Sequence, residues 1–428
     1  MFWKMTQYRL LSIFMFLFLI VGPLSTTQWN KVVIVSIFLL ASMVIFLSSL
    51  LSKKNRFWSL ALYSSLCYVA AFVIALFAIL LTREHLTGEY IDSVIIGRLF
   101  TFITVLMMVY LVNIWLASSD AKQLEKALRV AFFILLVFVL LGILQFIGNL
   151  VGVPFFIETR DWMHGVPSAI RSVVPKRLTS IAEEPNFLSP LLIEYLIITG
   201  LVIGGRNIKY TLYALGLFVV LFSFSGGVYI NLLLLIFVYG ILSLFRSLMK
   251  GVLKGHDFVF IFGMFLCFVF IIFVGDVLLE FLYYKVQGEA AGQSSRGQFL
   301  VSLIQLIANS GFSQLIFGHG MGTMGVLTEF GLPKEDFIFS ISNNFYLDML
   351  WEGGFVGLSF IIIFFALLLY HGLKGYMNDR YVEAGLLLTI HMVITSLYRS
   401  EYLSTHFIWV LSLILVCYRL GHIKVKKS

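Results

Sequence analysis

The sequence predicts an all-α, polytopic membrane protein with about twelve spanning helices and two long loops on one side of the membrane. Composition is the first observation, because 60% of the 428 residues are hydrophobic and 12% are charged, against about 25% charged in soluble domains. The second is a series of apolar segments that each approach the ~20 residues needed to cross a bilayer. So few charges cannot cover a water-facing surface, so lipid must surround most of the chain.

The apolar segments follow one another with short connections. Lys4 and Arg9 precede the first segment as in a signal peptide, but no small-residue cleavage site follows, which predicts a retained helix. The segment 210–224 is short and runs into the next one around Ser223–Gly227. The predicted spans are residues 8–24, 31–52, 57–82, 96–117, 129–150, 187–205, 210–224, 226–245, 258–283, 351–371, 381–398 and 404–421.

Lysines and arginines in the connections predict the orientation. With the N-terminus inside, most of the 30 basic residues fall in cytoplasmic segments, as expected for a multi-pass protein of the cytoplasmic (inner) membrane with both termini cytoplasmic. The net charge of +8 is then anchoring charge, and the scattered basic residues argue against nucleic-acid binding. The predicted parts are N-terminal helices 1–150, external loop 151–186, central helices 187–283, external loop 284–350, and C-terminal helices with a basic tail 351–428.

The first external loop ends in a concentration of polar residues where the chain re-enters the membrane. Arg177 could clamp an anion, and Glu183 or Glu184 could act as a base. Asn186 and, within the span, Glu194 would share one helix face. An intramembrane carboxylate indicates function by default, although helix capping and a buried pairing with another helix stay open as alternatives.

The second external loop carries the other candidates. Apolar spacing predicts a helix over Arg296–Ser310, lying at the outer membrane interface. Gly318–Gly322 is either a plain turn or a binding loop, and Arg399 either forms only a local ion pair with Glu401 or binds substrate. The remaining polar candidates of this side are Arg296, His319, Asn343, Asn344, Tyr346, Asp348 and Glu352.

Several chemistries have no signature in the chain. It has no Walker A sequence and no dinucleotide fingerprint, and Cys67, Cys267 and Cys417 fall in apolar runs without metal-ligand spacing. We therefore expect neither metal nor cofactor. Group transfer would need a donor already activated in the membrane, and on the external face a lipid-linked pyrophosphate suits the arginines.

Three stretches resemble the bacterial O-antigen polymerase and O-antigen ligase superfamily, over roughly residues 175–370. Their order and spacing carry the resemblance. They are Arg177–Ser180 with Glu184–Leu188, Arg296 with Leu315–Gly322, and Asn343–Leu347 with Glu352–Leu358. The resemblance implies a membrane glycosyltransferase of GT-C-like architecture, in which Arg177 and Arg296 hold pyrophosphate or acidic sugars.

One departure separates the branches of that superfamily. Ligase-like members carry a histidine, proposed as the acceptor base, where this chain has Asn343, and asparagine cannot be a general base. The family's Ser-x-Ser-Arg segment is present only as Ser223–Gly227, without the arginine. The resemblance therefore implies a repeat-unit polymerase of O-antigen, capsule or exopolysaccharide.

Such a polymerase would take polyprenyl-pyrophosphate-linked repeat units within membrane lipid. A chain-length regulator and a flippase of the same pathway are its expected partners. Three alternatives stay open: an O-antigen ligase-type transferase, a flippase or transporter of lipid-linked oligosaccharide, and a purely structural membrane protein.

Overall fold

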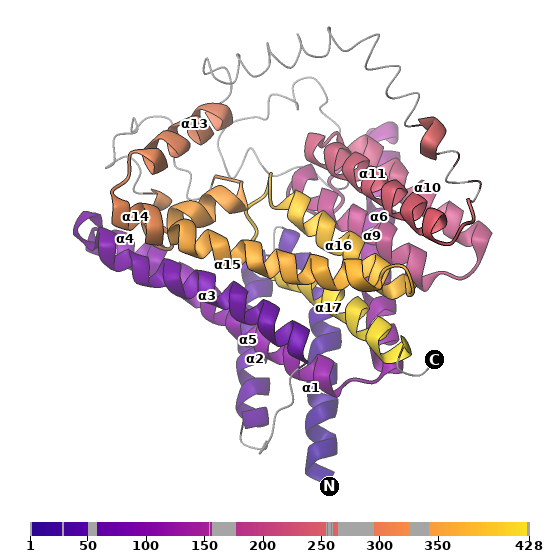
Figure 1. Ribbon diagram of the computed structural model, residues 1–428, viewed down its shortest axis with the longest axis horizontal. Coiled ribbons are helices and arrows are strands. Elements are labelled where there is room, and N and C mark those ends of the chain that lie inside the picture. The colour runs from indigo at the N-terminus through magenta and orange to yellow at the C-terminus, as the bar shows by residue number, and fades with distance from the viewer. Residues whose placement is uncertain are drawn as a thin grey trace. The chain divides into compact units, whose positions relative to one another are not determined.

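The computed structural model describes residues 2–27, 30–49, 58–153, 155, 177–253, 255, 258, 260–263, 295–325 and 342–425. These residues form helices (Figure 1). No β-strand occurs among them, and the one β-bridge in this part of the chain joins Thr27 and Ala182. The all-α prediction is confirmed for the described residues.

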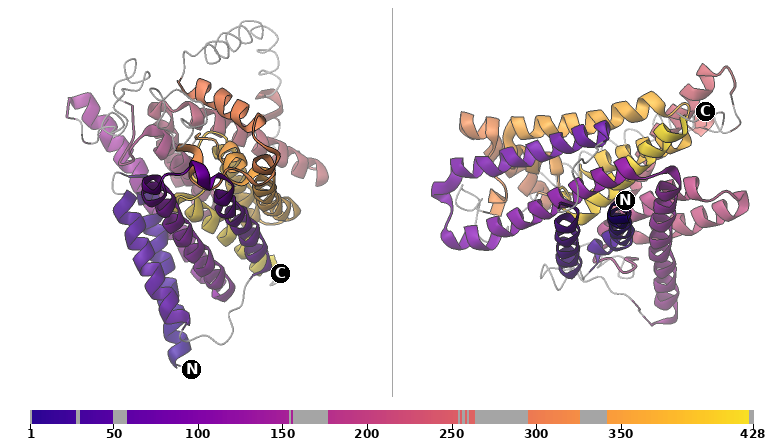
Figure 2. Two further views of the ribbon diagram at one scale, coloured as in Figure 1. Left: turned by 90° about the vertical axis from the view of Figure 1, so that its left-hand side faces the viewer. Right: turned by 90° about the horizontal axis from the view of Figure 1, so that it is seen from below.

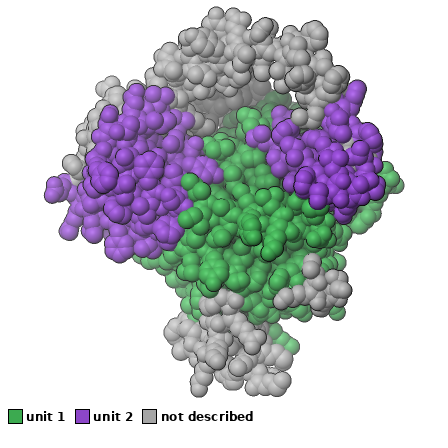
Figure 3. All heavy atoms as spheres, in the orientation of Figure 1, with its two compact units in different colours: residues 1–69, 97–232, 361–428 green, residues 70–96, 233–360 purple. Residues whose placement is uncertain are grey.

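The chain divides into two compact units, each assembled from segments far apart in sequence (Figure 3). The first comprises residues 1–69, 97–232 and 361–428, and the second residues 70–96 and 233–360. Three boundaries fall inside α3 (Ser59–Thr82), α11 (Gly226–Met249) and α15 (Phe345–Gly375), and the fourth directly follows the first residue of α5.

The first unit contains most of the long helices. In it α1 and α2 run side by side, as Figures 1 and 2 both show, and α16 packs along α17. Besides parts of the three divided helices, its elements are α1 (Phe2–Val21), η1 (Gly22–Thr26), α2 (Asn30–Ser49), α5 (Ile96–Ser118), α6 (Ala121–Val151), α9 (Pro185–Val202), α10 (Arg206–Ser223), α16 (Arg380–Thr395) and α17 (Thr405–Val425).

The second unit has shorter elements. They are η2 (Arg83–His85), α4 (Gly88–Tyr90), η3 (Ile91–Ile95), α13 (Ser295–Ala308) and α14 (Phe312–Phe317), together with parts of α3, α11 and α15. Helix α13 confirms the helix predicted over Arg296–Ser310. Its predicted place at the membrane interface stays a prediction.

Within the described ranges of the chain, eight helices are long and apolar enough to cross a membrane. They support an all-α polytopic membrane protein, and all eight coincide with predicted spans. They are Arg9–Thr26, Ser59–Thr82, Ile96–Ser118, Ala121–Val151, Pro185–Val202, Gly226–Met249, Phe345–Gly375 and Thr405–Lys424.

The other four predicted spans stay predictions. Residues 210–224 and 381–398 coincide with α10 and α16, which are not among these eight, and 31–52 coincides with α2, whose fully described apolar part is Lys31–Ile45. Most of 258–283 lies outside the described residues. The total of twelve, and the orientation, are therefore predictions from the sequence.

Large apolar side chains cover much of the surface of the helices. Val32 and Leu39 on α2 are 68% and 61% exposed, and Phe77 and Leu80 on α3 are 65% and 66% exposed. In water, contiguous apolar surface of this kind would drive association. Lipid is the solvent that such helices require.

Candidate functional site

The polar segment at the end of the first long loop, residues 177–184, is buried in the first unit. Gln145 of α6 fixes it, because its Oε1 accepts the backbone N–H groups of Thr179 and Ser180 at 2.9 and 2.8 Å. Ser180 adopts a positive φ of 52° and donates its hydroxyl to the carbonyl of Phe138. The hydrogen bonds of Gln145 and Ser180 thus hold the candidate site in place.

Three charged side chains of this segment are removed from water. Arg177, Glu183 and Glu184 are 6, 5 and 9% exposed. Burial raises the pKa of Glu183 to about 7, repulsion from Glu184 adds to the rise, and Lys31 opposes it. A carboxyl group that titrates near neutral pH can both accept and donate a proton under working conditions.

Helix α9 begins directly after these carboxylates, with Pro185 at its first position, where proline is favoured. The Asn186 side chain accepts the Ser225 hydroxyl at 2.9 Å, and its carbonyl accepts from Arg399 at 2.7 Å. The Arg399 guanidinium also lies 4.4 Å from the centre of the Phe187 ring. The start of α9 is thus tied to two distant parts of the chain.

The predicted ion pair between Arg399 and Glu401 is confirmed. Burial acts to raise the pKa of Glu401, but Arg399 and then His406 outweigh it and hold this pKa at about 2. Glu401 is therefore a permanent anion beside a permanent cation.

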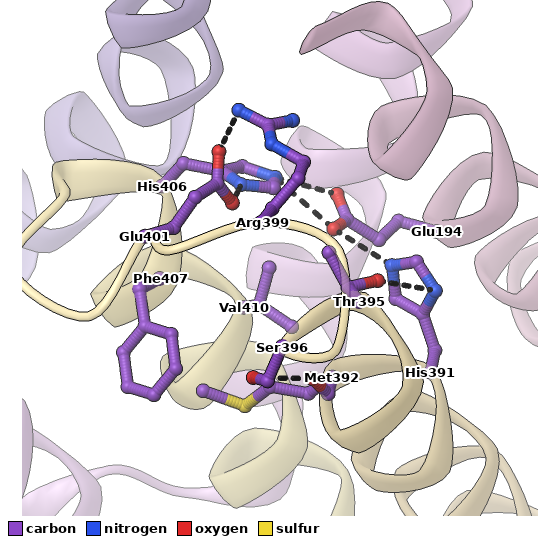
Figure 4. Close-up of a pocket in the computed structure, with 10 residues that line it drawn as sticks. All are labelled: Glu194, His391, Met392, Thr395, Ser396, Arg399, Glu401, His406, Phe407 and Val410. Carbon is purple, nitrogen blue, oxygen red and sulfur yellow. Dashed lines mark hydrogen bonds and ion pairs between the residues drawn. The ribbon is translucent and has the colours of Figure 1, made fainter. Parts of the chain in front are cut away.

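Further along α9, the buried carboxylate of Glu194 meets two histidines from other helices (Figure 4). His406 Nε2 of α17 lies 3.0 Å from Glu194 Oε1, and His391 Nε2 of α16 lies 3.4 Å from the same oxygen. On its other side, His406 Nδ1 lies 2.8 Å from Glu401. The buried pairing that the sequence left open for Glu194 is confirmed.

This histidine–carboxylate cluster borders a small cavity (Figure 4). Its volume of about 20 Å³ suffices for one water molecule and is far too small for a sugar. The cavity is lined by Glu194, His391, Met392, Thr395, Ser396, Arg399, Glu401, His406, Phe407 and Val410.

In the second unit, the glycine-rich segment Gly318–Gly322 is a structural junction. Helix α15 is broken at Gly354, where φ is 62°, and the carbonyls near this break accept the loop's amides. His319 donates to Trp351 O at 2.7 Å and Gly320 to Glu352 O at 3.0 Å. Gly322 donates to the Glu352 carboxylate at 2.8 Å. Backbone amides that already donate to these oxygens are not available to bind a phosphate. The contacts therefore favour a plain turn at Gly318–Gly322 over a binding loop.

Close backbone contact explains why glycines occupy this junction. A Cβ on Gly318 would lie 2.4 Å from the carbonyl carbon of Glu352, and one on Gly354 would lie 2.4 Å from that of Ile316. Only hydrogen at Cα permits these approaches.

His319 and Glu352, both predicted to bind substrate, have structural contacts here. The His319 ring stacks on Trp351 with centroids 3.9 Å apart, and its Nε2 shares a 2.8 Å hydrogen bond with Ser310. Burial lowers the pKa of His319 to about 4, so the ring is neutral at physiological pH. A role in sugar binding stays a prediction for both residues.

The asparagines before α15 shape its first turn. Asn343 has a left-handed φ of 59°, and Asn344 Oδ1 accepts the N–H groups of Tyr346 and Leu347, each at 3.1 Å. Asp348 accepts the N–H of Ser342 at 2.8 Å. Arg296 lies on α13, and its side chain is outside the described residues. The predicted sugar-orienting roles of Asn343, Asn344 and Tyr346 are not tested by these contacts.

No protein-family model matches this chain, and no curated protein matches its sequence. The site is therefore interpreted from its own residues. Among the described residues, no group of three or more His, Cys, Asp or Glu side chains is arranged to hold a metal ion.

The sequence interpretation missed His391, His406, Asn231 and Gln145. A signal was present for the two histidines, because ionisable residues inside apolar runs are costly in lipid and indicate a partner. Nothing in the sequence pointed to Gln145, whose importance depends on which loop folds against α6.

Proposed function

We propose that this protein is an oligosaccharide repeat-unit polymerase, joining polyprenyl-pyrophosphate-linked units on the external face of the cytoplasmic membrane. The observation that carries the proposal is the buried group of Arg177, Glu183 and Glu184 directly before and at the start of α9. The resemblance of the same segment to the polymerase superfamily supports it.

The chemistry follows from these residue types. Glu183 or Glu184 takes the proton from an acceptor sugar hydroxyl, whose oxygen forms a bond to the anomeric carbon of the donor chain. The bond from that carbon to the pyrophosphate oxygen breaks, and polyprenyl pyrophosphate leaves with the bonding electrons. Arg177 neutralises its charge. General base catalysis by the carboxylate contributes about 10²–10⁴-fold.

Deletion with analysis of surface glycans tests the activity. Loss of the polymer ladder, with single repeat units still attached to their final acceptor, supports a polymerase. A ladder that persists but is not attached to its acceptor would instead indicate a ligase.

Point variants test the site. Glu183→Gln, Glu184→Gln and Arg177→Lys keep the side-chain size and should abolish or strongly shorten the ladder at unchanged protein level in the membrane. Arg83→Ala removes an exposed arginine of η2 and serves as the matched control with a normal ladder. Normal ladders in all three site variants would refute the assigned roles.

A second candidate is a flippase or transporter of lipid-linked oligosaccharide. The cluster of Glu194, His391 and His406 favours it, because buried carboxylates and histidines within spans are typical of proton-coupled transport. The leaflet in which lipid-linked units accumulate after deletion discriminates the two: the inner leaflet indicates a flippase, the outer leaflet a polymerase.

A further inference from the structure

The histidine–carboxylate cluster of the first unit is a continuous row of acid–base groups that reaches the surface at one end. Glu401 is 14% exposed, whereas the side chains of His406, Glu194 and His391 are 3, 0 and 1% exposed. Successive members lie 2.8, 3.0 and 3.4 Å apart. The row therefore leads from the molecular surface into the interior of the helices.

Geometry assigns the proton positions in the row. Both ring nitrogens of His406 face carboxylates, so both carry hydrogen and the ring is an imidazolium. With Arg399 the cluster then holds two cations and two anions, Glu194 and Glu401, and is electroneutral while His391 is uncharged.

His391 differs because its two nitrogens face unlike partners. Nε2 faces the Glu194 carboxylate at 3.4 Å, which favours a hydrogen on Nε2, whereas Nδ1 lies 3.0 Å from the amide nitrogen of Asn231, a donor. In this arrangement Nδ1 has no hydrogen, and the ring is neutral.

Asn231 is itself incompletely satisfied. Its Nδ2 lies within 3.1 Å of three groups, Nδ1 of His391, Oγ1 of Thr395 and the hydroxyl of Tyr398, although an amide nitrogen has only two hydrogens. Its Oδ1 is buried and has no partner among the described residues. A half-turn of the amide would bring Oδ1 to the same three groups, all of which could then donate to it.

We propose that His391 is a proton-binding site inside the helical bundle, and that rotation of the Asn231 amide accompanies its occupation. The incoming proton comes from water and binds Nδ1, and Asn231 Oδ1 accepts the new N–H while Nε2 still faces the Glu194 carboxylate. This inference does not depend on the proposed polymerase activity.

A route for the proton borders the site. The cavity of about 20 Å³ can hold one water molecule and is lined by Glu401, Thr395 and His391. The Thr395 hydroxyl lies 3.4 Å from His391 Nδ1 and can pass a proton between water and ring.

Charged groups around His391 explain why it, and not His406, is the group that changes. Glu194 on α9 favours the charged ring, while His406 on α17 and Arg399 after α16 oppose it. Glu401 lies beyond His406 and favours the charge more weakly, and Tyr398 is a neutral phenol. His391 faces one carboxylate whereas His406 faces two, so His391 is the ring that can exchange its proton.

Solid-state NMR of the full chain in liposomes, with ¹⁵N-labelled histidine, tests the proposal between pH 8.5 and 5. Among the signals of the eight histidines, that of His391 should convert from neutral ring to imidazolium, and His391→Gln should remove it. His422→Gln, in the last turn of α17, is the matched control that loses only its own signal.

Two near-isosteric changes keep the test valid if His391→Gln does not fold. Asn231→Asp supplies an anion to Nδ1 and should raise the midpoint by at least about one pH unit, whereas Asn231→Leu cannot accept and should lower it. A His391 signal that does not titrate in this range, or a midpoint that neither variant moves, would overturn the proposal. The glycan ladder measures the polymerase activity separately from the NMR signal, so a negative result for one proposal does not contradict the other.

Discussion

Replacing Gly320 by alanine tests whether the glycine segment Gly318–Gly322 is a structural junction. Gly320 has φ of +105°, and an added Cβ would lie 2.6 Å from the Cα and N of Ile79 in α3. Both obstructing atoms are helix backbone, so neither can move aside as a flexible side chain would. The substitution should therefore destabilise the second unit.

The expected magnitude combines two costs. A side chain at positive φ costs about 1–2 kcal/mol, and overpacking costs about 1–3 kcal/mol. Their sum of roughly 2–5 kcal/mol corresponds to a decrease of about 30- to 4,000-fold in the folding equilibrium, at 1.4 kcal/mol per tenfold.

Unfolding by sodium dodecyl sulfate in mixed micelles, followed by circular dichroism, measures this difference. Gly97→Ala in α5 is the matched control, because nothing lies within 4 Å of its added Cβ and alanine favours a helix by up to about 1 kcal/mol. If Gly320→Ala unfolds at the same detergent fraction as Gly97→Ala, the segment is not packed as described. A binding loop would instead lose substrate affinity at unchanged stability.

Three further changes probe the buried charges. Glu194→Gln leaves the His406 imidazolium with one carboxylate. It should destabilise the first unit by about 3 kcal/mol, the lower end of the cost of breaking a buried ion pair. The same detergent unfolding measures this loss, and a stability equal to that of the wild type would contradict the pairing. Because the pKa of Glu183 is raised from 4.5 to about 7, its protonated form favours folding, and this stability is lost as pH rises from 4.5 through 7. A pH series of Glu183→Gln should lack that loss. The pKa of His319 is lowered from 6.5 to about 4, so the neutral ring favours folding and this stability is lost as pH falls from 6.5 through 4. In the same unfolding measurement, His319→Gln should lose less stability than the wild type over this pH range.

The apolar segments predicted most of the fold directly. Length and hydropathy are local properties, and they suffice for a helix in lipid because every backbone group must be satisfied within its own segment. The eight helices that are long and apolar enough all coincide with predicted spans for this reason. The break in α15 at Gly354 could not be predicted in the same way, because it depends on the loop that donates to the freed carbonyls.

For the charged residues in apolar surroundings, too, the sequence determined one part and the tertiary structure another. The sequence by itself determined that Glu194 must have a partner, since an isolated carboxylate in lipid is too costly, and that Arg177, Glu183 and Glu184 gather before a helix. Only the tertiary structure decided that the partners are His391 and His406, more than 190 positions away along the chain. It also decided that Glu352 accepts from Gly322. Composition determines which solvent a helix needs, whereas the pairing of buried charges depends on distances between helices that no local pattern encodes.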